Sequence, residues 1–156
     1  KTTLAKLVCK DLERYNVKNQ LLDGDDIRAF FKDEMGYSEK DRKDNLKRIA
    51  FASKLLSNNG ITVVVAAVSS VGREFLRKNL ENYIQIFVNA PINKVIERDT
   101  KGMYKKFTEG KTKNLVGMDI PYHEPNSPNI VVNTDKETIQ ESHKIIIKHL
   151  KKLSVL

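Results

Sequence analysis

The chain has 156 residues, a formal net charge of +8 and 40% hydrophobic residues, enough for one domain with its own core. Its longest apolar runs are far shorter than the ~18 residues of a membrane-spanning helix, so no membrane partner and a cytoplasmic location are expected. Cys9 is the only cysteine, which excludes an internal disulfide and a cysteine-based zinc site. Because lysines alternate with acids along the chain, a local anion site fits the charge better than a nucleic-acid partner does.

The chain opens on Lys1-Thr2-Thr3, directly before apolar residues at helical spacing that predict a helix over residues 2–15. This opening is typical of the end of a Walker A loop, whose glycines would then lie upstream of residue 1. Such a loop needs a lysine for the β and γ phosphates, a hydroxyl for Mg²⁺ and a helix N-terminus behind both. The alternative is an ordinary helix cap.

The rest of the chain predicts a parallel α/β fold in which helices cover both faces of a central sheet. The expected elements are a strand ending at Leu22, a helix from Asp25 or Asp26, a helix capped at Ser38 and ending near Asn58, a strand over 61–68, a helix over 73–81, a strand over 83–88, a helix over 91–98, a strand over 130–133, and a helix over 136–152 with Ile139, Ile146, Leu150 and Leu153 on one face. Residues 99–129, rich in glycine and proline, are expected to be a long functional loop such as a lid.

Polar residues follow the predicted strands, where parallel sheets bind ligands. Asp23 and Asp25 come after one strand, Ser69 and Ser70 come after the next, and Asn89 follows the one after that. One carboxylate can serve Mg²⁺ while the other takes the proton of a substrate hydroxyl during phosphoryl transfer, and Asp25 is the base candidate. An Asp-Gly-Asp turn with a helix N-cap would satisfy the same residues. On the helices that follow, Arg28, Arg42 and Asn45 could hold acceptor phosphates, or the arginines could form surface ion pairs.

Several motifs together resemble the adenylylsulfate (APS) kinase family. They are Leu-Leu-Asp-Gly-Asp at 21–25, Gly-Tyr-Ser-Glu-Lys-Asp-Arg-Lys-Asp-Asn at 36–45, Glu-Arg-Asp at 97–99, Lys-Gly-Met-Tyr-Lys-Lys at 101–106 and Gly-Met-Asp-Ile-Pro-Tyr at 117–122. The resemblance implies a P-loop kinase fold, a three-layer sandwich with a parallel central sheet and a lid over about 100–122. It also implies ATP and Mg²⁺, transfer of the γ-phosphoryl group to the 3′-hydroxyl of a nucleotide, and a single domain over 1–156 that lacks its first strand and the glycines of Walker A.

The resemblance also assigns site residues, and it makes a homodimer possible. It places Lys1, Thr2, Thr3 and Arg98 at ATP, Thr2 and Asp23 at the metal, and Asp25, Lys1 and Asp23 at the catalytic centre. At the nucleotide acceptor it places Arg28, Arg42, Asn45, Ala67, Val68, Ser69, Lys101, Lys105, Asn114 and Leu115.

The chain departs from the family where the acceptor base is held. Two phenylalanines that typically sandwich adenine are Ala67 and Leu115 here, and base stacking contributes ~1–3 kcal/mol per base. An arginine of the family is Gly72, with Arg73 beside it as a replacement candidate. These departures resemble kinases of bacterial capsule pathways that phosphorylate the 3′-hydroxyl of cytidine diphosphoramidate, which is therefore the favoured acceptor.

Two alternatives stay open at this point. One is an adenylylsulfate kinase that makes 3′-phosphoadenylylsulfate, and the other is a non-catalytic nucleotide-binding regulatory domain. Retention of Asp23, Asp25, Arg28 and the lid lysines argues against the non-catalytic alternative. A basic nucleic-acid-binding domain would explain the charge but not the motif spacing.

Overall fold

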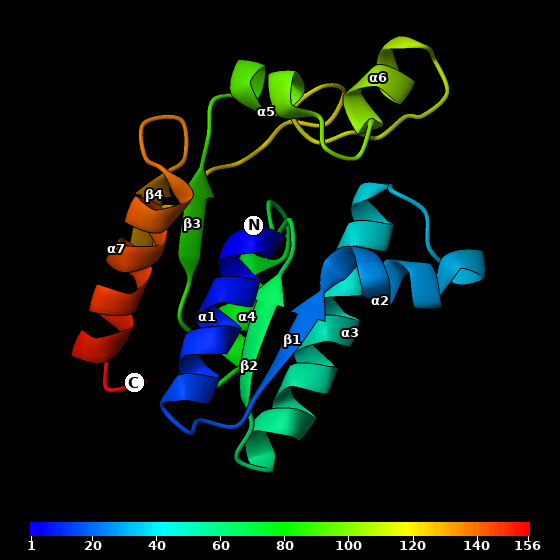
Figure 1. Ribbon diagram of the computed structural model, residues 1–156. Coiled ribbons are helices and arrows are strands. Elements are labelled where there is room, and N and C mark those ends of the chain that lie inside the picture. Colours follow the sequence, from blue (N-terminus) through cyan, green and yellow to red (C-terminus); the bar gives the residue numbers. More distant parts are fainter.

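The computed structural model describes residues 1–156, the side chain of Asp33 excepted. In chain order the elements are α1 (Thr2–Arg14), β1 (Asn19–Asp23), α2 (Gly24–Phe30), the 3₁₀ helix η1 (Lys32–Glu34), α3 (Glu39–Asn58), β2 (Thr62–Ala66), α4 (Arg73–Asn79), β3 (Ile86–Asn89), α5 (Ile92–Arg98), α6 (Met103–Thr108), β4 (Ile130–Asn133) and α7 (Ile139–Lys152) (Figure 1). The predicted alternation of helices and strands is therefore confirmed.

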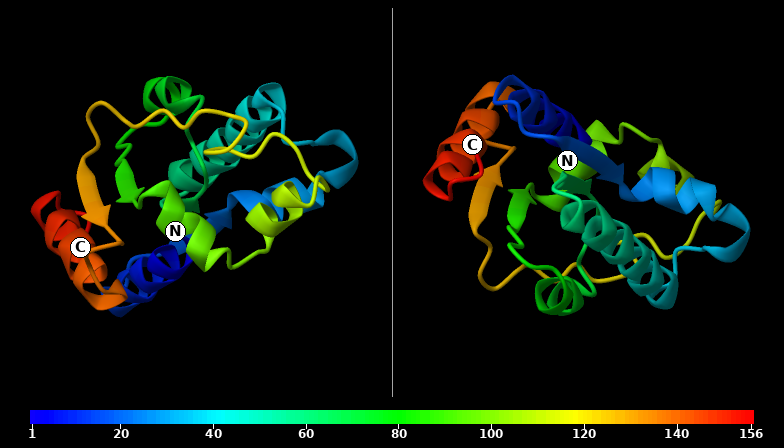
Figure 2. Two further views of the ribbon diagram at one scale, coloured as in Figure 1. Left: turned by 90° about the horizontal axis from the view of Figure 1, so that it is seen from above. Right: turned by 90° about the horizontal axis from the view of Figure 1, so that it is seen from below.

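The strands lie between two layers of helices (Figure 2). On one face α1 and α7 bury a cluster that includes Leu12, Ile130 and Ile146. On the other face α3 and α4 bury a smaller cluster around Ile49 and Leu76. No helix within the described residues is both long and apolar enough to cross a membrane.

The strands form two parallel pairs, β1 with β2 and β3 with β4, and β2 and β3 exchange no backbone ladder. Within the pairs, Asp23 lies opposite Ala66, and Asn89 lies opposite Asn133. One core cluster nevertheless contains β2, β3 and β4 side chains, and the carboxyl ends of the strands point toward α5 and α6 (Figure 1).

Local capping sets the starts of the two longest helices. The Ser38 side chain accepts from the Asp41 amide while Asp41 accepts from the Ser38 amide, as the sequence predicts for this helix start. Thr138 and Glu141 form the same box at α7, which therefore begins at Ile139 and not at residue 136. Ile139 at the first position of this helix and Leu153 at its C-cap are about half exposed, whereas Ile146 and Leu150 between them are buried.

The segment predicted as a loop over 99–129 contains one helix, α6. Gly102 precedes this helix in the left-handed region, at φ 64°. The Asp99 carboxylate accepts from the amides of Tyr104 and Lys105 at 3.1 and 3.0 Å, which caps the first turn. Together α5, α6 and the loop that follows lie above the carboxyl ends of the strands (Figure 1).

Candidate active site at the carboxyl ends of the strands

Asp23 is the last residue of β1, and its side chain forms a hydrogen bond with the start of α1. The Thr2 hydroxyl donates to its Oδ2 at 2.7 Å, and the Asp25 amide donates to its Oδ1 at 2.9 Å. Burial works to raise the pKa of Asp23, but these two hydrogen bonds, with Lys101 and Lys1 nearby, outweigh it and the pKa lies below its ordinary value. The structure thus brings together the two residues predicted to hold a metal.

Asp25 lies in the first turn of α2, and its side chain is largely exposed. Its carboxylate accepts from the ammonium group of Lys101, which is 76 residues away at the start of the lid. This hydrogen bond to Asp25 raises the pKa of Lys101, and the charges of Asp23 and Asp26 act in the same direction. Lys101 therefore lies at the acidic cluster.

Arg28 and Arg42 share the ring of Tyr37, with their guanidinium carbons 4.7 and 5.6 Å from its centroid. Arg28 is buried and donates to the Gly36 carbonyl. Burial, and then the charge of Arg28, lower the pKa of Arg42 from its ordinary value. In the part of the chain whose side chains are described, neither guanidinium forms an ion pair, so the alternative of surface ion pairing is wrong.

Asn45 supports the Asp-Gly-Asp turn from beneath. It is buried, and its Nδ2 donates to the Gly24 carbonyl at 3.0 Å, while its Oδ1 has no partner within the described residues. A Cβ added at Gly24 would lie 3.1 Å from the Cβ of Ala67. Ala67 therefore packs directly on the turn that carries Asp25.

The lid closes on α3 through Arg42, whose Nη2 donates to the Asn114 carbonyl at 2.6 Å. Asn114 has a φ of 61°, and the amides of Asn114 and Leu115 donate to the Asp119 carboxylate at 2.7 and 2.6 Å. Asp119 thus holds this turn in place and aims the Asn114 carbonyl at Arg42. Both predicted acceptor positions in the lid, Asn114 and Leu115, lie beside Arg42 for this reason.

The far end of the lid is tied to the loop after β2 and to α4. Ser70 is buried, and its hydroxyl accepts from the His123 amide at 3.0 Å. Arg73 donates to the His123 carbonyl, and its guanidinium carbon lies 5.6 Å from the Tyr122 ring centroid. The guanidinium of Arg73 is therefore committed to the lid, which is not the acceptor contact that sequence reasoning suggested for it.

Arg98, predicted at the ATP base, lies at the carboxyl end of the β3–β4 pair. Its Nη1 donates to the Thr134 hydroxyl at 3.2 Å and its Nη2 to the Thr134 carbonyl at 2.5 Å. The Thr134 hydroxyl donates in turn to the Asn89 carbonyl. Arg98 is thus held at the same edge of the strands as the acidic cluster.

Several predicted residues, Lys1 and Leu115 among them, have no side-chain hydrogen bond or ion pair within the described residues. Thr3 and Val68 are exposed, Ser69 is half-buried with no hydrogen-bond partner among the described residues, and Lys105 reaches Asp99 only through its backbone amide. Sequence reasoning missed Tyr37 and Asp119 as site residues, although the family motifs contain both. Ser70 was a candidate as a hydroxyl after a strand, and the structure places it at the far end of the lid.

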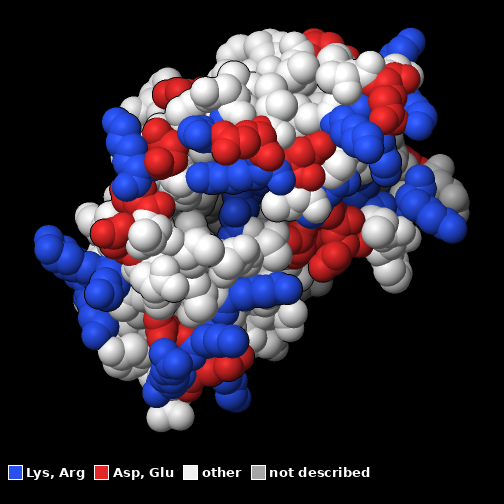
Figure 3. Space-filling view, turned by 45° about the horizontal axis from the view of Figure 1, so that its top comes forward, with Lys and Arg blue, Asp and Glu red and all other residues white. Residues whose placement is uncertain are grey.

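The site is open to solvent. A view that brings the lid forward shows a hollow whose rim carries intermixed basic and acidic side chains (Figure 3). Thr2 and Asp23 fit Mg²⁺, because it takes one or two protein oxygens and fills its other positions with phosphates and water. Within the described residues no cluster of three or more His, Cys, Asp or Glu could hold a metal alone, as expected for an ion shared with phosphates.

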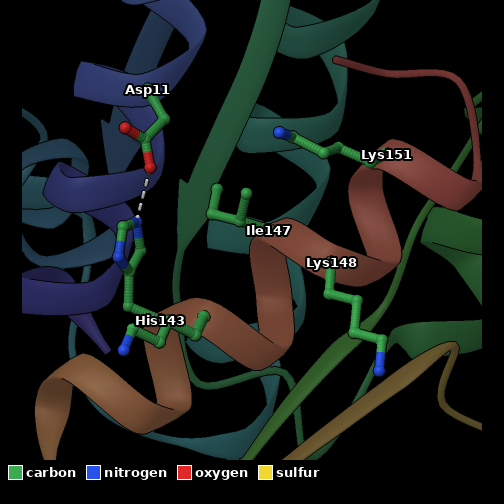
Figure 4. Close-up of a pocket in the computed structure, with 6 residues that line it drawn as sticks. Asp11, His143, Ile147, Lys148 and Lys151 are labelled. Carbon is green, nitrogen blue, oxygen red and sulfur yellow. Dashed lines mark ion pairs between the residues drawn. The ribbon is translucent and has the colours of Figure 1, made fainter.

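A separate pocket of about 410 Å³ lies between α1 and α7, away from the acidic cluster (Figure 4). Ile147 and the stems of Lys148 and Lys151 line it. At its wall His143 Nε2 lies 2.8 Å from Asp11 Oδ2, an ion pair when the imidazole is protonated. His143 therefore links the two helices.

Comparison with known proteins places this geometry among nucleotide kinases. The family model described as adenylylsulphate kinase matches residues 1–133. The adenylyl-sulfate kinase of a Picosynechococcus species is 36% identical over 158 aligned residues, which cover 100% of this chain and 89% of that protein. The adenylyl-sulfate kinase of Rippkaea orientalis is 39% identical, with 100% and 87% covered.

A solved structure agrees with these sequence relatives. The APS kinase CysC of Mycobacterium tuberculosis, in complex with AMPPNP and APS, superimposes with a TM-score of 0.90 at 29% identity. The alignment covers 97% of this chain and 90% of that one.

Proposed function

Because the chain belongs to the adenylylsulphate kinase family, we propose that it transfers the γ-phosphoryl group of ATP to the 3′-hydroxyl of a nucleotide, with adenylylsulfate as the first candidate acceptor. The α/β P-loop kinase fold expected from the sequence is confirmed by the match to the mycobacterial enzyme. The names of the curated relatives favour adenylylsulfate over the cytidine compound that the sequence departures suggested.

The observation that carries the proposal is the pair of guanidinium groups on Tyr37. Two cations that share one ring, with no described carboxylate bound to either, favour an anionic ligand, because it would relieve their mutual repulsion. A phosphate-linked acid group of an acceptor nucleotide has the charge and the oxygen geometry that two guanidinium forks bind. Arg28 lies on α2, the helix whose first turn carries Asp25, and Asn45 holds the start of that helix at Gly24.

The proposed reaction is an in-line displacement. The 3′-oxygen forms a bond to the γ-phosphorus while the bond from that phosphorus to the β–γ bridging oxygen breaks, leaving ADP. Asp25 accepts the proton of the 3′-hydroxyl, and Lys101, released from Asp25, faces the charge of the transferring group. Lys1 binds the β and γ phosphates, and Mg²⁺ at Thr2 and Asp23 would neutralise phosphate charge. Arg98 contacts the ATP base.

A second candidate acceptor is cytidine diphosphoramidate, and Ala67 and Leu115 favour it. Both are half-buried at the two sides of the acceptor site, where they replace the stacking rings expected for adenine. The loss of stacking weakens adenine binding more than that of a smaller base held by other contacts. The diphosphate-like group and the ribose would still meet Arg28, Arg42 and Asp25.

We also infer that a strand preceding Lys1 fills the space between β2 and β3. Each of these strands has one edge without a ladder partner, although side chains of both pack in one core cluster with α1. A strand inserted there in parallel would end next to Lys1, as a Walker A loop requires. The curated relatives extend beyond the matched region, which leaves room for such a segment.

A coupled kinase assay on the protein with its natural upstream sequence tests these proposals. ATP and Mg²⁺ are supplied with either adenylylsulfate or cytidine diphosphoramidate, and ³¹P NMR locates the product phosphate. Turnover of adenylylsulfate alone supports the first acceptor, and turnover of the cytidine compound alone supports the second. Turnover of neither compound would contradict both and favour a non-catalytic nucleotide-binding role.

Two variants then test whether the base is read where we propose. Ala67→Phe and Leu115→Phe restore the missing rings, so each should lower the KM for adenylylsulfate by up to ~5–150-fold, the equivalent of ~1–3 kcal/mol of stacking. Val131→Phe, which changes an exposed side chain on β4 that is not assigned to the acceptor site, is the control. An equal effect of all three would show that these positions do not contact the base.

A further inference from the structure

One turn of the lid, over residues 114–120, is held together by bonds within itself. The Asp119 carboxylate accepts from the amides of Asn114 and Leu115, one on each oxygen, at 2.7 and 2.6 Å. The Leu115 carbonyl in turn accepts from two amides further along the turn, at 3.0 and 3.3 Å. We call residues 114–120 the lid turn. Its first two residues are tied to the rest by Asp119, which is the one acid that the turn contains.

The lid turn connects α3 to α5. The Asn114 carbonyl accepts from Arg42 Nη2 at 2.6 Å, and Arg42 also donates from Nε to the Tyr37 carbonyl at 3.0 Å. Further along, Gly117 lies so close to α5 that an added Cβ would be 2.7 Å from Ile92 Cδ1. The position of the turn therefore decides where Arg42 finds its lid partner.

The two backbone partners of Arg42 determine which of its donors are left for a ligand. Nε and one proton of Nη2 are used, whereas Nη1 has no hydrogen-bond partner among the residues that the structure describes. Nη1 and the second proton of Nη2 still form a fork that fits two oxygens of an anion. Because the Asn114 carbonyl holds Nη2 from the other side, the direction of this fork depends on the orientation of that carbonyl.

The lid turn needs support for its backbone conformation. Asn114 has a φ of 61°, in the left-handed region that residues with a side chain adopt rarely. The hydrogen bonds from two successive amides to one carboxylate are charge-assisted, so they favour this conformation over others. The Asp119 side chain is exposed, and its hydrogen bonds within the described residues are these two. Its described contacts thus serve the turn.

We propose that Asp119 is a positioning residue for the acceptor nucleotide. It holds the lid turn so that the Asn114 carbonyl orients the free fork of Arg42 and Leu115 stays beside it. This proposal rests on the proposed kinase function, in which Arg42 binds the phosphate-linked acid group of the acceptor. Asp119 acts through Arg42 and not on the reacting atoms, so its loss should weaken acceptor binding and leave ATP binding unchanged.

Steady-state kinetics of the protein with its natural upstream sequence test this role. Asp119→Ala should raise the KM for the acceptor roughly 10-fold or more, because two hydrogen bonds to a charged group are lost, while the KM for ATP stays within about twofold. Asp119→Asn keeps one acceptor oxygen and should lie between wild type and Asp119→Ala. The control is Glu109→Ala, since Glu109 is the other acid of the lid and pairs with Lys111 at 2.8 Å; it should change neither KM. Equal rises in both KM values for Asp119→Ala would overturn the proposal.

A double-mutant cycle tests whether Asp119 acts through Arg42. In an Arg42→Ala background, Asp119→Ala should raise the KM for the acceptor by no more than about a further twofold, because the group that it orients is already absent. A purely structural role would give the same factor in both backgrounds. Full additivity of the two changes would therefore contradict the proposal.

Hydrogen exchange at the Asn114 and Leu115 amides needs no turnover, so failure of this inference can be distinguished from failure of the kinase function. Both amides should exchange more slowly in wild type than in Asp119→Ala. Adenylylsulfate or cytidine diphosphoramidate should slow them further in wild type but not in Arg42→Ala. Equal exchange in wild type and Asp119→Ala would overturn the proposal, with or without kinase activity. Slow exchange in a wild type that turns over neither acceptor would refute the kinase function and support the hold of Asp119 on the turn.

Discussion

Replacement of Asp25 by asparagine separates chemistry from stability more cleanly than any other change in the site. The Asp25 side chain is 61% exposed, and Lys101, its one described ion-pair partner, is 58% exposed. Because solvent screens such a pair, loss of the charge should change the free energy of unfolding by less than ~1 kcal/mol. If Asp25 accepts the proton of the acceptor hydroxyl, kcat should fall by roughly 10²–10⁴-fold, or about 3–5 kcal/mol of activation free energy.

The matched control is Asp26→Asn, because Asp26 is the exposed neighbour of Asp25 and has no hydrogen-bond or ion-pair partner among the described residues. Initial rates at saturating ATP and acceptor, together with urea unfolding of each variant, give both quantities. The reasoning is refuted if Asp25→Asn keeps more than about a tenth of wild-type kcat, or if Asp26→Asn loses as much.

Three further predictions concern the acceptor, the lid and pH. Arg42→Ala should raise the KM for the acceptor by roughly 10–150-fold with a smaller change in kcat, since a hydrogen bond to a charged group contributes about 1.5–3 kcal/mol; a KM for Arg42→Lys that stays at the wild-type value would contradict fork-like binding. Gly117→Ala should lower kcat/KM more than Gly110→Ala. Both glycines have a positive φ, but only at Gly117 would the new Cβ lie 2.7 Å from Ile92 Cδ1. Equal losses in the two variants would refute a role for that contact. The pKa of Asp23 lies below its ordinary value, so its charge stabilises the fold above about pH 4 and this contribution is lost as the pH falls through the folded-state pKa. Urea unfolding from pH 7 to pH 3 should therefore show the stability gap between wild type and Asp23→Asn shrink, and a gap that widens would contradict the sign.

Much of the site could be predicted because its parts are local in the sequence. Asp23 and Asp25 follow a strand directly, and the end of a parallel strand is where such a fold presents ligand-binding side chains. Ser38 and Asp41 signal a helix start through a three-residue spacing that backbone geometry alone explains. The start of α7 was predicted less well: the expected helix begins at residue 136, whereas the capping box of Thr138 and Glu141 starts it at Ile139.

The sequence by itself determined the order of helices and strands, the cap at Ser38, the acidic turn after β1 and the family of the chain, since periodicity, capping and motif spacing act between neighbouring residues. Only the tertiary structure decided that Lys101 pairs with Asp25, that Arg42 holds the Asn114 carbonyl, and that Arg73 turns to the lid. It also decided that the strands divide into two pairs. These contacts join residues 50 or more positions apart, and their geometry depends on how the whole chain packs, which no local pattern encodes.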